Sequence, residues 1–154
     1  MSELKRTILY QAHLDAGATM VDFGGWDMPI QYPEGIIAEH LYCRRHCGIF
    51  DVSHMGRIDV EGPDQVAFLQ HVLSSNVLAL DLNQAQYCII PDANGYAIDD
   101  AYLYRFEEGK YFLVINAGNI DKDWAHLMNE AKNFDVKLTN VSDKYAAIAV
   151  QGPE

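Results

Sequence analysis

The chain has 154 residues, of which 49% are hydrophobic and 21% charged, a balance that supports a folded domain with its own core. Lys and Arg number 11 and Asp and Glu number 22, so the net charge is −11 at pH 7. This charge excludes nucleic acid as the main ligand and argues against an anionic membrane surface.

No stretch reaches the roughly 18 apolar residues that cross a membrane, and the start of the sequence lacks the apolar run of a signal peptide. A cytoplasmic protein is therefore expected. In that setting Cys43, Cys47 and Cys88 are expected to be reduced thiols rather than a disulfide framework.

The first third of the chain is expected to contain one irregular segment and one helix. Residues 18–33 combine aromatic residues with glycines and prolines, which favours an ordered irregular segment. The helix is expected over residues 33–47, because basic residues precede Gly48, which can adopt a left-handed cap. Ile37 and Leu41 are expected on its buried side.

Two further helices are expected, each with apolar residues at helical spacing. One begins at Pro63, which suits the first helical position. The other begins at Asn119, whose side chain can cap it, and stops at Asn133. The apolar positions are Val66, Leu69, Val72 and Leu73 in the first of these helices, and Ile120, Trp124, Leu127, Met128 and Ala131 in the second.

Strands are expected where β-branched and aromatic residues alternate with other residues, at 57–61, 85–90, 97–105, 111–116, 135–139 and 145–150. Turn-forming residues at 91–95 and 107–110 join the second, third and fourth of these strands into an antiparallel meander. Helices and strands do not alternate strictly, so the sequence predicts an α+β fold rather than a doubly wound parallel sheet.

Two adjacent carboxylates, Asp99 and Asp100, lie within the third predicted strand. Because side chains alternate across a strand, Asp100 shares a face with Tyr102 and Tyr104, whereas Asp99 shares the other face with Leu103. This divergence argues against an Asp99–Asp100 pair that shares one proton. The carboxylate with two phenols suits a flat heteroaromatic ligand such as a pterin or a purine. The alternative is an edge strand whose carboxylates simply point into solvent.

A zinc site is a weaker hypothesis. His40, Cys43 and Cys47 would lie on one face of the first predicted helix, and their side chains are zinc ligands. However, the second ligand pair of a zinc knuckle is missing, and cysteines are common buried residues, so no metal site is expected.

Other motifs carry less information. Asp51, Ser53 and His54 have the residue types of a hydrolase triad, but such near neighbours favour a polar corner in which Asp51 or Ser53 binds nearby amides. No Walker loop or G-x-G-x-x-G motif follows a predicted strand. Taken alone, Asn116 is interpreted as a turn or cap residue and Tyr87 as a core residue.

Several separated segments resemble, in the same order, the aminomethyltransferase or T-protein family of the glycine cleavage system. They are Met20–Trp26 with Met28 and Pro29, Gly48–Gly56, Gln84–Tyr87, Ile98–Asp100, Val114–Ala117 with Asn119, Lys122 and Asp123, and Gln151–Pro153. The resemblance implies a tetrahydrofolate-dependent transfer. In it the methylene carbon on the aminomethyl-lipoyl arm of H-protein passes to tetrahydrofolate, and ammonia is released.

The resemblance also implies the site. Asp100 is similar to the family's catalytic carboxylate, which hydrogen-bonds the reacting nitrogen of the folate or takes its proton. The positions that contact the pterin or neighbouring folate atoms are Met55, Tyr87, Tyr102, Tyr104 and Asn116. One departure affects the turn before this strand, because the family usually has two glycines there and this sequence has Gly95 followed by Tyr96.

The fold implied is a three-lobed ring around a folate channel. Residues 1–50 and 140–154 are expected in a discontinuous first lobe and residues 51–139 in the second. Family members are longer, so an N-terminal fragment that is inactive alone is expected. The alternative function is a non-catalytic folate-binding or iron–sulfur assembly scaffold domain. Those relatives resemble a K-G-C-Y-x-G-Q pattern, which this sequence lacks.

Overall fold

Two units make up the computed structural model, which describes residues 3–154. The first unit comprises the described residues up to His54 together with Asp143–Glu154, and the second comprises Met55–Ser142. The assignment of residues 1–50, 140–154 and 51–139 to lobes of a larger ring stays a prediction.

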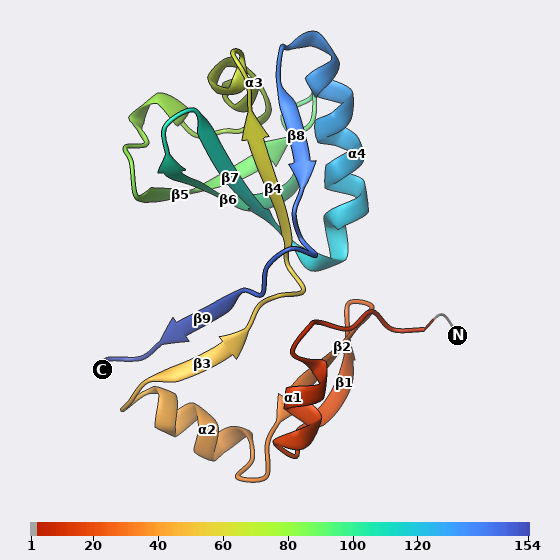
Figure 1. Cartoon of the computed structure of the whole chain (residues 1–154), viewed down its shortest axis with the longest axis vertical. Helices are drawn as coiled ribbons and strands as arrows, with labels where there is room; N and C mark the ends of the chain where they lie inside the picture. Colours follow the sequence, from red (N-terminus) through yellow and green to blue (C-terminus); the bar gives the residue numbers. More distant parts are fainter. Residues whose placement is uncertain (1–2) are drawn as a thin grey trace. The chain divides into compact units, whose positions relative to one another are not determined.

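The second unit is built on a five-stranded sheet with strand order β5-β6-β7-β4-β8, in which every neighbouring pair is antiparallel (Figure 1). Its strands are β4 (Gly56–Glu61), β5 (Gln84–Pro91), β6 (Ala97–Glu107), β7 (Lys110–Ile115) and β8 (Lys137–Asn140). Its helices are α3 (Gln65–Val72) and α4 (Ile120–Glu130), with short 3-10 turns at Val77–Ala79, Ala117–Asn119 and Ala131–Asn133. The predicted meander and the α+β class are confirmed.

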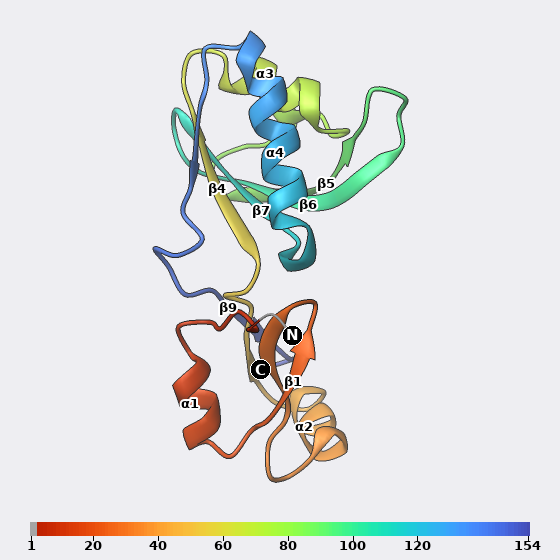
Figure 2. The same cartoon turned by 90° about the vertical axis from the view of Figure 1, so that its right-hand side faces the viewer.

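One face of this sheet carries the core. Alternate strand residues, including Ile58, Val60, Leu103, Leu113 and Ile115, are 0–1% exposed and pack with α3 and α4. Figure 2 shows α4 running along the sheet. The opposite face carries aromatic residues that remain partly exposed, such as Tyr102. The strand that carries Asp100 is therefore buried on one side only.

The edge-strand alternative is wrong for most of the strand, although Asp99 and Asp100 themselves lie beyond the end of β7 and, among the described strands, pair only with β5. Strand β6 lies between β5 and β7 and pairs with both. Its residues Ala101 and Leu103 are 4% and 0% exposed, so the strand is internal and its polar end requires another explanation.

The first unit contains α1 (Tyr10–Asp15), β1 (Thr19–Phe23), β2 (Trp26–Gln31), α2 (Ile36–Cys43), β3 (Gly48–Asp51) and β9 (Ile148–Gln151). Strands β1 and β2 pair with each other, and β3 pairs with β9. Neither α1 nor β3 was predicted from the sequence. Strand β9 occupies only the second half of the segment predicted at 145–150.

The expectation of an irregular segment at residues 18–33 is wrong, because most of it forms the β1–β2 hairpin. The turn consists of Gly24 and Gly25, with φ angles of +59° and +87°. Two consecutive positive φ angles fit the twist of a two-residue hairpin, and glycine adopts them without strain. The side chain of Asp22 accepts a hydrogen bond of 2.9 Å from the Gly25 backbone.

The helix predicted over residues 33–47 is shorter and less buried than expected. It ends at Cys43, and Ile37 and Leu41 are 77% and 44% exposed, so their assignment to a buried side is wrong. The apolar residues of α2 surround the helix instead of forming one stripe, so periodicity could not identify a buried face.

The other predicted helices are largely confirmed. Leu69, Val72 and Leu73 are buried in or beside α3, and Leu127 is buried on α4. Met128 is an exception with 42% exposure. Asn119 is the N-cap residue of α4, but its side chain makes no capping hydrogen bond.

Among residues 3–154, no helix is both long enough and apolar enough to span a bilayer.

Candidate functional site

Asp100 lies on the face of the sheet opposite the core. It pairs in register with Ile89, next to the cross-strand pair Tyr87 and Tyr102. The rings of Tyr87 and Tyr102 are 5.6 Å apart between centroids, and that of Tyr104 lies 6.1 Å beyond Tyr102. Tyr87 and Tyr102 are 52% and 48% exposed. The predicted face of one carboxylate with several phenols is therefore present.

Asp100 is held by a side chain that follows the neighbouring strand β7. The Nδ2 atom of Asn116, which follows β7, donates a hydrogen bond of 2.8 Å to Asp100 Oδ1. The Tyr87 phenol on β5 lies on the same face of the sheet. Burial, followed by the neighbouring Asp100 carboxylate, raises the pKa of Tyr87, so the phenol stays protonated beside that carboxylate.

The two adjacent carboxylates face different sides, as the alternation predicts, but both reach one amide group. Asn116 Nδ2 also donates to Asp99 Oδ1, at 2.9 Å. This is possible because β7 ends at Ile115, opposite Ala101, so the next residue extends across the end of the sheet. The amide of Asn116 has two N–H groups and can serve both carboxylates at once. Its interpretation as a turn or cap residue alone is therefore incomplete.

Met55 precedes β4 at the same end of the sheet. Register pairs Gly56 with Ile115, and Ile115 with Ala101, so Met55 and Asn116 lie at neighbouring strand ends, level with Asp100 in β6. A side chain at position 56 would place its Cβ 2.5 Å from Ile115 Cγ1. Glycine is therefore required for the close approach that brings these strand ends together.

A residue that the pattern analysis did not single out is Asp123 on α4. Its side chain is 0% exposed, both of its carboxyl oxygens are buried without a hydrogen-bond donor in the described part of the chain, and its carboxyl group faces that of Asp99. The sequence did hold a signal, because position 123 lies between Ile120 and Leu127 on the apolar stripe of the helix. A carboxylate at a buried helical position needs a partner or a proton.

The turn before Asp100 is ordered despite the departure at Tyr96. Asp92 Oδ1 accepts hydrogen bonds from the backbone of Asn94 at 2.8 Å and of Tyr96 at 2.9 Å. Gly95 has a φ of +84°, and the Tyr96 side chain is 74% exposed. The single glycine is therefore sufficient to close this hairpin.

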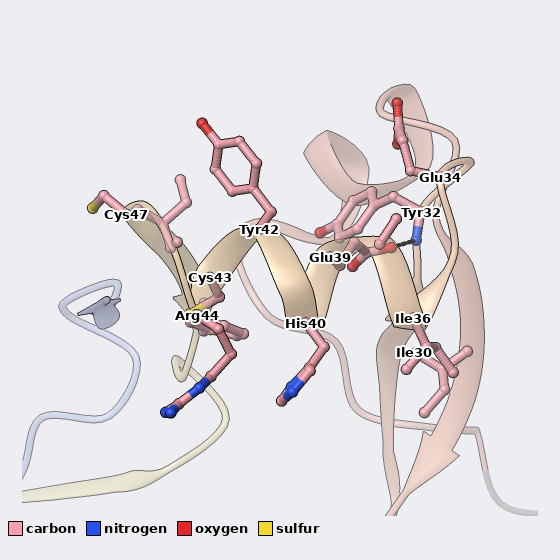
Figure 3. Close-up of a pocket in the computed structure, with 14 residues that line it drawn as sticks. Ile30, Tyr32, Glu34, Ile36, Glu39, His40, Tyr42, Cys43, Arg44 and Cys47 are labelled. Atoms are coloured by element: carbon pink, nitrogen blue, oxygen red, sulfur yellow. Dashed lines mark hydrogen bonds between the residues drawn. The ribbon is translucent and has the colours of Figure 1, made fainter. Parts of the chain in front are cut away.

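A cavity of about 770 Å³ lies in the first unit, beside α2 and the ends of β2 and β3. Figure 3 shows Cys43 and His40 on the helix and Cys47 beyond its end, with its sulfur directed away from His40. Cys43 Sγ donates to the backbone oxygen of Gln151 at 3.8 Å. Over residues 3–154 no cluster of three or more His, Cys, Asp or Glu side chains is arranged to hold a metal ion.

The polar corner predicted at Asp51 and Ser53 is confirmed. Asp51 Oδ1 accepts from the Ser53 backbone at 2.8 Å, and Ser53 Oγ accepts from the Ala147 backbone at 3.0 Å. The partners from more distant parts of the chain are Thr7 Oγ1 at 2.7 Å and His13 Nε2 at 3.0 Å, both on Asp51 Oδ2. This network joins α1 to β3 within the first unit.

The antiparallel sheet is covered by helices on one face and carries an aromatic-flanked carboxylate on the other, which defines an α+β domain with one open face. Residues 9–154 match the family model described as the GCVT N-terminal domain. The chain belongs to this family.

Curated relatives support the same family. An aminomethyltransferase of Deinococcus deserti is 54% identical over 151 residues, which cover 98% of this chain and 42% of the relative. An aminomethyltransferase of Thermus thermophilus is 48% identical over 151 residues, 98% of this chain and 43% of the relative. The chain thus spans well under half the length of these relatives.

A solved structure has the same fold. The glycine cleavage system aminomethyltransferase T of Bartonella henselae superposes with a TM-score of 0.93 at 39% identity, over 98% of this chain and 41% of that one. The resemblance that the sequence motifs indicated is therefore confirmed at the level of family and fold.

Proposed function

We propose that this chain forms the pterin-facing part of a tetrahydrofolate-dependent aminomethyltransferase of glycine cleavage. The reaction would move the methylene carbon from the aminomethyl-lipoyl arm of H-protein to tetrahydrofolate, with release of ammonia. The observation that carries the proposal is Asp100, held by Asn116 on the open aromatic face of the sheet beside Tyr87 and Tyr102.

In this proposal Asp100 is the catalytic carboxylate. It accepts a hydrogen bond from the reacting nitrogen of the folate, or takes its proton as that nitrogen attacks the methylene carbon. Asn116 restricts the orientation of the carboxylate, which favours a productive geometry. Tyr102 and Tyr104 supply flat apolar surface for a pterin ring, and Met55 lies at the neighbouring strand end.

The charge of the chain favours the pterin end of the folate. With a net charge of −11, the chain does not attract the anionic glutamate tail, whereas the pterin ring carries hydrogen-bond donors that match carboxylates. Lipoylated H-protein is the proposed partner, and a cytoplasmic location stays a prediction. The curated relatives named above are aminomethyltransferases, so the alternative of a non-catalytic folate-binding or iron–sulfur assembly scaffold has less support.

The test is calorimetric titration of the 154-residue chain with tetrahydrofolate under anaerobic conditions, with Asp100→Asn beside it. We expect saturable binding that the substitution weakens by about tenfold, because a charge-assisted hydrogen bond is lost. Asp121→Asn is the matched control, since Asp121 is an exposed carboxylate on α4. A guanine nucleoside serves as the purine comparison and is expected to bind more weakly than the folate.

Equal affinities of the wild type and Asp100→Asn would remove Asp100 from the site. A chain that is folded by circular dichroism yet does not bind tetrahydrofolate would show that the folate site is not carried by these 154 residues.

A further inference from the structure

Asp123 has a buried carboxyl group that receives no hydrogen bond from an N–H group among the described residues. Its side chain is 0% exposed. The adjacent cation does not neutralise it by contact, because Lys122 Nζ donates instead to the backbone oxygen of Ile98 at 2.8 Å. A buried, ionised and unpaired carboxylate would be very unfavourable.

The partner of Asp123 is a second carboxyl group. Asp99 Oδ1 accepts from Asn116, while Asp99 Oδ2 is buried without a donor among residues 3–154, as are both oxygens of Asp123, and the two carboxyl groups face each other. Two carboxyl groups in contact cannot both be ionised, so they share one proton. The charged groups that act on Asp123 are Asp99 and Asp100 from β6 and Lys122 from its own helix.

The proton resides on Asp123. Burial, followed by the hydrogen bond and charge of Asp99, raises the pKa of Asp123 to about 8. Burial also acts to raise the pKa of Asp99, but hydrogen bonds from Asp123 and Asn116 outweigh it and lower the pKa. At neutral pH Asp123 is therefore the donor and Asp99 the acceptor.

A continuous chain of hydrogen bonds follows. Protonated Asp123 donates to Asp99, Asp99 accepts one N–H group of Asn116, and the same amide donates to Asp100 at 2.8 Å. We propose that Asp123 is a positioning residue, whose proton orients Asp99 and the Asn116 amide and thereby holds Asp100 toward its ligand. The role toward a ligand rests on the proposed function of Asp100, whereas the shared proton does not.

The shared proton is tested on the 154-residue chain without ligand, by NMR titration of the Asp carboxyl carbons and the Asn116 side-chain amide. We expect one carboxyl to titrate with a midpoint near 8, with the Asn116 amide protons shifting over the same range. Asp123→Asn should abolish this transition, because an amide still donates to Asp99 but does not titrate. Asp121→Asn should leave it intact.

The positioning role is tested by measuring the affinity for tetrahydrofolate between pH 6.5 and 9. This range extends at least about one pH unit to either side of the Asp123 titration midpoint. Wild-type affinity, taken relative to Asp123→Asn at each pH, should fall as Asp123 loses its proton. Asp123→Asn should bind as the wild type does at pH 6.5, and Asp123→Leu should bind about tenfold more weakly. A purely structural role would lower the melting temperature of both variants and leave the pH profile of affinity unchanged.

The outcomes separate the two proposals. An unchanged titration in Asp123→Asn, or Asn116 amide protons that do not move, overturns the hydrogen-bond chain whatever the ligand. If the wild-type chain does not bind tetrahydrofolate, both the proposed function and the positioning role are overturned. The NMR titration still tests whether Asp99 and Asp123 share a proton. Asp123→Leu with wild-type affinity overturns the positioning role alone.

Discussion

Asn116 holds Asp100 at two points, since its Nδ2 atom lies 2.8 Å from the carboxylate Oδ1 and 3.2 Å from the backbone oxygen of the same residue. A carboxylate fixed relative to its own backbone has little rotamer freedom left to lose when a ligand binds. The amide is thus as important for the candidate site as the carboxylate.

Replacing this amide should therefore weaken the site. We predict that Asn116→Ala lowers the affinity for tetrahydrofolate by about tenfold, because Asp99 and Asp100 lose a common donor and repel each other. The free energy of unfolding should fall by about 1 kcal/mol. Calorimetry and thermal denaturation measure the two effects. Asn129→Ala, an exposed change on α4, should alter neither, and an unchanged affinity in Asn116→Ala would contradict the prediction.

The Tyr87 phenol lies on the same face of the sheet as Asp100. We predict that Tyr87→Phe lowers tetrahydrofolate affinity by about threefold to tenfold, since the ligand loses a polar hydroxyl group on this face while the ring remains. Tyr87 is 52% exposed, so the melting temperature should hardly change. Tyr96→Phe is the control, and an equal loss in both variants would mean that the phenols act nonspecifically.

Gly56 allows β4 and β7 to approach. We predict that Gly56→Ala lowers the free energy of unfolding by about 1–3 kcal/mol through overpacking, because the added Cβ would lie 2.5 Å from Ile115 and 2.9 Å from Ile120. Chemical denaturation measures the change. Gly118→Ala is the matched control, since no atom lies within 4 Å of its added Cβ, and a similar loss there would refute the steric explanation.

Acid should weaken the first unit through Asp51. Burial acts to raise the pKa of Asp51, but hydrogen bonds from His13, Ser53 and Thr7 outweigh it and lower the pKa. The stabilisation is present above the unfolded-state pKa of about 3.9 and is lost as the pH falls through the lower folded-state value.

We predict that Asp51→Asn is less stable than the wild type at pH 7 by about 1–3 kcal/mol, and that this difference shrinks as the pH falls below about 4. Melting temperatures from pH 7 to pH 2.5 measure it. The exposed Asp143→Asn is the control. A difference that stays constant with pH would show that the effect of Asp51 is not electrostatic.

Turn residues and the alternation of apolar residues explain which elements could be predicted well from the sequence. Strands β5, β6 and β7 are separated by short turn sequences and alternate clearly, so both the meander and the face of Asp100 could be predicted. The β1–β2 hairpin was missed because its glycine pair lies among aromatic residues and prolines that suggested an irregular segment. In α2 the apolar residues lie all around the helix, so its pattern predicted burial that the structure does not show.

The candidate site was predictable only in part, for a physical reason. Alternation along one strand and the family resemblance identified Asp100 and its tyrosines. The contact of Asp99 with Asp123 joins two elements that are distant in sequence, so it depends on how α4 packs on the sheet. A buried carboxyl on the apolar stripe of a helix was the available signal, and it becomes informative only when its partner is known.

In sequence, the whole second unit lies between the two segments of the first unit, and this order constrains how the chain folds during synthesis. The hydrogen bonds that close the second unit link Arg57 to Val141 at 2.9 Å and to Ser142 at 2.9 Å, so its whole sheet is available once residue 142 has been made. Strand β3 is translated long before, but its only strand partner among the described residues is β9, at Ile148–Gln151. The inner unit can therefore fold first, while the backbone hydrogen-bonding groups of β3 stay unpaired until β9 has been made, and an unpaired strand edge is prone to aggregation.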